Sequence, residues 1–356
     1  MKKIPFMVLF LLIMTGCVQE KIIDEIDIET AAAFDQLKKD EFIGTILVQD
    51  YLPDKTIINK VFTTEGSLRR DLLLNIQKQT SGDLVTGGLL ITIFGDKLAD
   101  KGIVDFVDTY QRDASIGSRN FLATSHGSAL EILKGDYGPQ GVSNYLYTLI
   151  EHNINQKDVP VTNLHIFLRD FYIKGKDPYL PELRRLNKTQ VEISGLSLFR
   201  GDREAYVLPK EKMFFFKLLA DRHSGEGSFD VNIGKGRKSA VRSIRSKHKY
   251  RLSKEDRSQV NIQIKIRGEI REYTGIKLTQ AIVDQIAKKL EKEIEVECMK
   301  LVKHFQKLDI DPIGFGYLHR KSIRGYDFEK NWKKDYQNLT FKINADVKIL
   351  ETGVIE

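Results

Sequence analysis

Apolar and polar side chains follow two different rhythms in the second half of the chain. Residues 262–266 alternate isoleucine with Gln and Lys, and residues 341–349 repeat this alternation. Successive side chains of a strand point to opposite faces, so each segment predicts a strand with one buried and one solvated face. From Leu278 to Leu308 apolar residues recur every three or four positions, which predicts a helix roughly 45 Å long. We expect an antiparallel sheet with this helix packed on it, because one-sided strands need one apolar cover.

The segment before these strands has the pattern of a hairpin followed by a helix. Strands are predicted at 191–199 and 204–208 around the turn Gly201-Asp202. Pro209 suits the start of a helix over 210–222. Cys298 falls inside the apolar stripe of the long helix, so we expect a buried, inert thiol.

The first half of the chain mixes short strand and helix patterns. Residues 18–40 are charged and lack strand alternation, so they predict a tether or an early helix. Strands are predicted at 42–49, 56–64, 89–94 and 119–124, and helices at 67–79, 97–110, 127–133, 142–153 and 164–173.

Together these patterns predict an α+β fold of several domains, with mixed or antiparallel sheets flanked by helices. We expect a signal peptide at 1–16, an N-terminal α/β region at 17–190 with room for two subdomains, and a C-terminal α+β domain at 191–356.

The first seventeen residues are typical of an export signal. Lys2 and Lys3 precede the apolar run 4–14, and Thr15-Gly16 leads directly to Cys17. The run is about half the roughly 20 residues that a membrane-spanning helix needs. A cysteine after small residues resembles the bacterial lipobox, with Met14 where leucine is usual. We therefore predict lipid attachment at Cys17 and a place on the outer face of a membrane. An intrachain disulfide is then not expected, since the chain has 2 cysteines.

The net charge of +7 suits anionic lipid headgroups or cell-wall polymers rather than nucleic acid in an exported protein. Basic residues are densest at 235–254. There Arg245, Lys247, Lys249 and Arg251 alternate, so a strand would place all four on one face. They are candidates for an anionic-surface or partner contact, and the alternative is an ordinary solvated strand face.

No catalytic, metal or cofactor site is predicted. The histidines lack metal-ligand spacing, no Gly-x-Ser-x-Gly occurs, and residues 234–239 lack the spacing of a phosphate-binding loop. Asp311 and His319 are interpreted as a turn residue and a surface histidine rather than an acid–base pair. The pattern favours a binding or assembly role over catalysis.

Four segments resemble the Ger(x)C lipoproteins, the C subunits of nutrient germinant receptors in spore-forming Firmicutes. The first is the lipobox ending at Cys17. The second is Ile91–Asp113, with its Gly-Asp-Lys-Leu-Ala, Gly-Ile and Arg-Asp sequences. The third is Ile193–Phe199 followed by the helix to Leu219. The fourth is Asp309–Gly316, Asp-Ile-Asp-Pro-Ile-Gly-Phe-Gly, continuing through Trp332 to the last strand. One departure is Val18–Lys21, where the family commonly has Trp-Asp-Arg-x-Glu.

The resemblance implies mixed α/β domains and a non-enzymatic subunit required for assembly or signalling in nutrient-triggered germination. It also implies two integral membrane partners, the A-type and B-type receptor subunits, and a place on the outer face of the spore inner membrane. An extracytoplasmic solute-binding lipoprotein is the main alternative, although such proteins normally have two doubly wound lobes. A wall-modifying enzyme is a further alternative.

Overall fold

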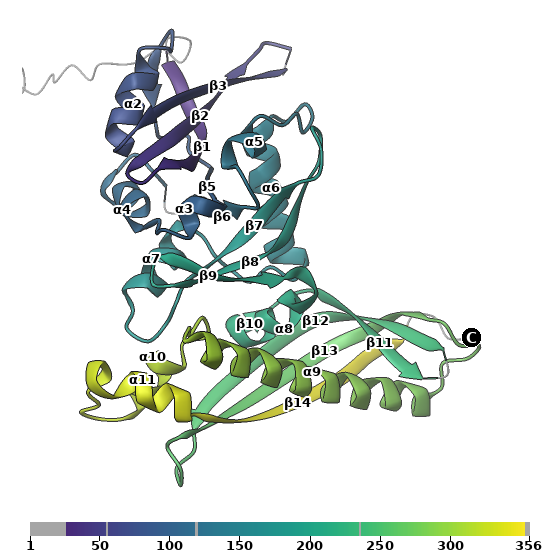
Figure 1. Cartoon of the computed structure of the whole chain (residues 1–356). Coiled ribbons are helices and arrows are strands. Elements are labelled where there is room, and N and C mark those ends of the chain that lie inside the picture. The colour runs from purple at the N-terminus through teal and green to yellow at the C-terminus, as the bar shows by residue number, and fades with distance from the viewer. Residues whose placement is uncertain (1–25, 55, 118–119, 235, 353–356) are drawn as a thin grey trace, which may run out of the picture.

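The computed structural model describes residues 26–54, 56–117, 120–234 and 236–352. These residues form two lobes, each built around one sheet, and Figure 1 shows the first lobe standing on the second. None of the helices in these ranges is long and apolar enough to span a membrane.

The first sheet has the strand order β3-β2-β1-β5-β6-β7-β8-β9, with β4 paired to β1. Its strands are β1 (Ile26–Lys38), β2 (Glu41–Tyr51), β3 (Ile57–Gly66), β4 (Asp83–Val85), β5 (Ile91–Gly95), β6 (Phe121–Ser125), β7 (Tyr179–Arg185), β8 (Val191–Arg200) and β9 (Arg203–Pro209). Strands β1, β5, β6 and β7 run parallel, and the β2–β3 and β8–β9 hairpins extend the sheet antiparallel on either side.

The prediction of a tether or early helix for residues 18–40 is wrong over β1, and residues 18–25 lie outside the described ranges. Strand β1 is central, and Ala31, Ala32 and Ala33 are fully buried on both of its faces. A strand covered on both faces shows no alternation. Its charged side chains misled the prediction because Glu29 and Asp35 are buried too.

Helices cover both faces of the first sheet. One core joins α2 (Arg69–Gln77), α3 (Asp96–Ala99), α4 (Val104–Arg112) and α7 (Leu164–Tyr172) to the sheet, and the other joins α5 (Ala129–Leu133) and α6 (Val142–Gln156). The five predicted helices of this region are confirmed, except that the one expected at 97–110 divides into α3 and α4. Gly102, with φ 124°, lies at the division.

The second sheet has the order β10-β12-β13-β14, with β11 paired to β12. Its strands are β10 (His223–Ser224), β11 (Gly227–Gly234), β12 (Arg237–Leu252), β13 (Gln259–Tyr273) and β14 (Thr340–Thr352). The helices of this lobe are α8 (Lys210–Ala220), α9 (Gln280–Leu308), α10 (Phe315–Ser322) and α11 (Phe328–Asn338). The long helix α9 lies across one face of the sheet (Figure 1), burying Ile286, Leu290 and Ile294 against it.

The α+β class and the long helix packed on a sheet are confirmed, with one correction to the sheet. We expected antiparallel pairing throughout, but β13 and β14 are parallel. The three helices between them carry the chain back to the end of the sheet where β13 begins, which is what a parallel pair requires.

The β8–β9 hairpin belongs to both lobes. It extends the first sheet, yet Leu196, Leu198 and Leu208 pack in the core of the second lobe. The division expected at residue 190 therefore stays a prediction, because the strands that follow it serve both cores.

Candidate functional site

The two lobes meet where the segment between α7 and β7 touches the segment after α9. The N–H of Tyr317 donates to the carbonyl of Gly175 at 2.9 Å, and the N–H of Asp177 donates to the carbonyl of Asp311 at 2.9 Å. Gly175 has φ 88°, and a Cβ there would lie 2.4 Å from the carbonyl carbon of Gly316. A side chain at either glycine would force these two backbones apart.

Two buried carboxylates organise this junction. Asp311 accepts the N–H groups of Gly314, Phe315 and Gly316 at 2.8, 3.0 and 2.7 Å, so it caps the start of α10. Asp177 accepts the N–H of Asp311 at 2.7 Å and that of Gly201 at 3.0 Å. Burial raises the pKa of Asp311 to about 7 and also raises that of Asp177. Asp311 is thus confirmed as a turn residue, and its turn is part of the lobe junction.

The prediction that His319 lies on the surface is wrong. His319 is 5% exposed, its Nε2 lies 3.3 Å from the carbonyl of Arg257, and the rings of Tyr326 and Trp332 pack against it. Burial lowers its pKa. The sequence pattern does not show that α11 folds back over this face of α10, which is why the burial was missed.

The second family-like segment reaches the same junction from the first lobe. A Cβ at Gly102 would lie 2.4 Å from Oδ2 of Asp202, and the N–H of Ile103 donates to the carbonyl of Asp202 at 3.2 Å. Gly201 of the same turn donates to Asp177. A continuous set of contacts, which we call the junction path, therefore runs from Ile103 through turn 201–202 and Asp177 to Asp311.

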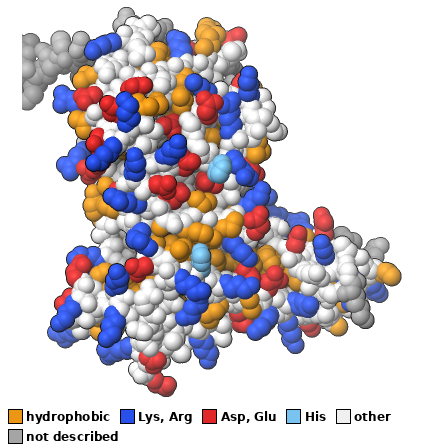
Figure 2. All heavy atoms as spheres, viewed as in Figure 1, with side chains coloured by type: hydrophobic (Ala, Val, Ile, Leu, Met, Phe, Trp, Pro, Cys, Tyr) orange, Lys and Arg blue, Asp and Glu red, His pale blue; other side chains and the backbone are white. Residues whose placement is uncertain are grey.

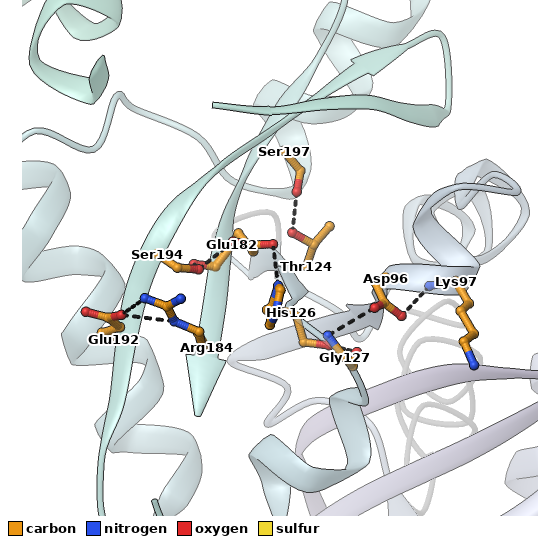
Figure 3. Close-up of polar contacts among 11 residues, drawn as sticks. Asp96, Lys97, Thr124, His126, Gly127, Glu182, Arg184, Glu192, Ser194 and Ser197 are labelled. Carbon is orange, nitrogen blue, oxygen red and sulfur yellow. Dashed lines mark hydrogen bonds and ion pairs between the residues drawn. The ribbon is translucent and has the colours of Figure 1, made fainter. Parts of the chain in front are cut away.

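Figure 3 shows the polar side chains at the carboxyl ends of β5 and β6. Asp96 accepts the N–H of Gly127 at 3.2 Å, which closes the loop after β6. Gly95 is needed beside it, since a Cβ there would lie 2.2 Å from Oδ1 of Asp35. Asp35 in turn accepts the N–H groups of Ala129 and Leu130, both at 2.8 Å. These family-like residues hold backbone in place.

The same view contains the nearest approach to catalytic geometry. Nδ1 of His126 lies 3.7 Å from Oε1 of Glu182, whose Oε2 accepts the Ser194 hydroxyl at 2.5 Å. The Thr124 and Ser197 hydroxyls bond to each other at 2.6 Å. Each of these hydroxyls is thus already committed to a hydrogen bond. Among the described residues no group of three or more His, Cys, Asp and Glu side chains could hold a metal ion.

A neighbouring carboxyl on β9 is strongly perturbed. Burial, with smaller contributions from the acidic Asp100, Glu182 and Asp96, raises the pKa of Glu204 to about 7. This side chain is a titrating group of the hairpin shared by the lobes.

The predicted basic residues Arg245, Lys247, Lys249 and Arg251 are all exposed on one face of β12. Ser246 and its neighbours on the opposite face turn toward the core, so the predicted alternation is present, while the role of these residues stays a prediction. Cys298 is fully buried, with Sγ 3.7 Å from the carbonyl of Phe215, and burial raises its pKa. Cys17 lies outside the described residues.

Comparison with known proteins assigns both halves of the chain. Residues 19–185 match the family described as spore germination protein N-terminal domain, and residues 194–353 match spore germination B3/GerAC like, C-terminal. Spore germination protein GerQC of Bacillus cereus is 30% identical over 357 residues, covering 98% of this chain and 99% of that protein. This chain belongs to the Ger(x)C family. The crystal structure of the GerBC protein shares the fold with a TM-score of 0.56, at 13% identity, over 90% of this chain and 97% of that one.

Within this Ger(x)C protein, sequence reasoning found Asp311 and the 95–103 segment but missed Gly175 and Asp177. The pair stands in Gly175-Lys176-Asp177, a glycine and an acid directly after a predicted helix. That is a turn signal, but nothing local shows that the turn faces a segment more than 130 residues away.

Proposed function

We propose that this chain is the lipoprotein subunit of a nutrient germinant receptor, anchored through Cys17 on the outer face of the spore inner membrane. Membership of the Ger(x)C family gives it a role in spore germination as part of a germinant receptor complex. The finer proposal is that it supports receptor assembly or signalling by holding the A-type and B-type membrane subunits.

The observation that carries the proposal is the junction path. The family-like residues around Gly102, Asp202 and Asp311 spend their hydrogen bonds on backbone groups that fix one lobe against the other. A catalytic subunit would instead be expected to aim such residues into an open cleft. Rigid coupling of two lobes suits a component that presents surfaces to partners at a fixed spacing.

The second lobe argues against the solute-binding alternative. Doubly wound lobes carry helices on both faces of a mostly parallel sheet. Here the face of β12 that bears Lys247 is exposed, and β10, β11, β12 and β13 pair antiparallel.

Replacing the lipid attachment residue tests the anchor and the role together. In spores carrying Cys17→Ala we expect no uptake of radioactive fatty acid into this protein and a loss of nutrient-triggered germination, because an unanchored subunit leaves the membrane. Cys298→Ala is the matched control and should keep both. Fatty-acid label on the Cys17→Ala protein would contradict the anchor, and normal germination without label would contradict the need for it.

A further inference from the structure

Strand pairing extends the basic face of β12 across the whole second sheet. Arg245 pairs with Arg267 and Lys247 with Lys265 on β13. Arg267 pairs in turn with Lys348 on β14. Directly paired residues of neighbouring strands share a face. The shared face has twelve positions, four on each strand: Arg245, Lys247, Lys249, Arg251, Asn261, Gln263, Lys265, Arg267, Lys342, Asn344, Asp346 and Lys348.

Eight of these positions, which we call the basic array, are Lys or Arg, and all eight side chains are exposed. Within the twelve, Asp346 is the one acidic residue, and it lies 3.6 Å from Lys265. Like charges directly opposite each other destabilise a sheet, and they stand well within a Debye length of about 8–10 Å. The fold therefore keeps a repulsive arrangement that it does not need for packing.

The same sheet shows that compensation is available elsewhere. Beyond the bulge after Ser243, Arg242 pairs with Glu226 and with Glu269, and Arg271 lies 2.5 Å from Glu269. Basic residues at that end are neutralised within the chain. Those of the array are left for something outside it.

We propose that the basic array binds an acidic segment of a protein partner. Its size fits one segment, since four alternate positions span about 20 Å and three strands about 10 Å. A lipid surface is a poorer fit. Nine residues separate Cys17 from Ile26, which limits an anchored tether to about 30 Å, and Ile26 begins β1 in the first lobe, at the far end of the molecule from the second sheet (Figure 1). Figure 2 shows the α9 side of that lobe, where basic and acidic side chains are interspersed.

This inference rests on the proposed receptor role, and zero-length crosslinking in spore membranes tests it. A carbodiimide joins a lysine amine to a carboxylate only when the two are in direct contact. We expect crosslinked peptides that join Lys247, Lys249 or Lys342 to Asp or Glu residues of one segment of another protein. Their yield should fall at least tenfold in 0.5 M salt, because exposed ion pairs are screened.

Matched variants make the result decisive. Replacing Lys247, Lys249 and Lys342 by Glu should abolish crosslinking through Lys265 and Lys348 as well, whereas replacing the exposed Lys330, Lys333 and Lys334 of α11 by Glu should leave it unchanged. If the array variant fails to accumulate, Lys247→Arg and Lys249→Arg keep the charge and should lose crosslinks only at those two sites.

Two outcomes would overturn the proposal: array lysines without protein crosslinks while anionic phosphatidylglycerol vesicles bind through the array, or equal yields from the array and α11 variants. Failure of the receptor role looks different, because the crosslinks would then form with a protein that is not a receptor subunit.

Discussion

Replacing Gly175 by alanine should loosen the junction between the lobes. A non-glycine residue in the left-handed region costs about 1–2 kcal/mol, and Gly175 has φ 88°. The added Cβ would also lie 2.4 Å from the Gly316 carbonyl carbon and 2.5 Å from the Tyr317 nitrogen. Both are backbone atoms that cannot rotate away, and such overpacking adds about 1–3 kcal/mol. We expect a total loss of about 3 kcal/mol.

Gly325→Ala is the matched control, since Gly325 has φ 73° but nothing within 4 Å of its added Cβ. It should lose only the conformational part, about 1–2 kcal/mol. Guanidinium unfolding of the chain without its first 17 residues measures both variants, and limited proteolysis reports opening between the lobes. Equal losses and equal proteolysis for the two variants would refute the idea that close packing at Gly175 locks the junction.

Three further variants or treatments test the cores and the hairpin shared by the lobes. Leu290→Asp should destabilise the second lobe by several kcal/mol in thermal melting, because it buries an unpartnered carboxylate; the exposed Lys288→Asp should not. Cys298 should resist iodoacetamide at pH 8 until the chain is unfolded, and rapid labelling of the native protein would place it at the surface. Glu204→Gln should gain about 1 kcal/mol over the parent at pH 8 and nothing at pH 4 in urea unfolding. Raising a carboxyl pKa to about 7 on folding makes the parent lose stability as pH rises from about 4.5 to 7; a gain that does not change with pH would contradict the assignment.

Local periodicity predicted the elements whose partners matter little to their pattern. The stripe of α9 and the alternation of β13 follow directly from one buried side. Strand β1 was missed because both of its faces are buried, and the parallel pairing of β14 was missed because pairing direction depends on the path of the chain between strands.

The candidate site was predictable only in part. Asp311 could be assigned to a turn from its neighbours Pro312 and Gly314, but its partner Asp177 lies in another lobe. The basic face of β12 was visible from alternation alone, whereas the matching residues on β13 and β14, such as Arg267 and Lys348, needed the register of three strands.

The most direct test of the receptor role is affinity purification of this protein, carrying a C-terminal tag, from detergent-solubilised spore inner membranes. Quantitative mass spectrometry should find the two integral membrane receptor subunits at a constant ratio to it, and spores lacking this chain should contain less of both or fail to respond to nutrient. Recovery of the protein without either membrane subunit, together with normal subunit levels and normal germination in spores that lack it, would contradict the proposed function.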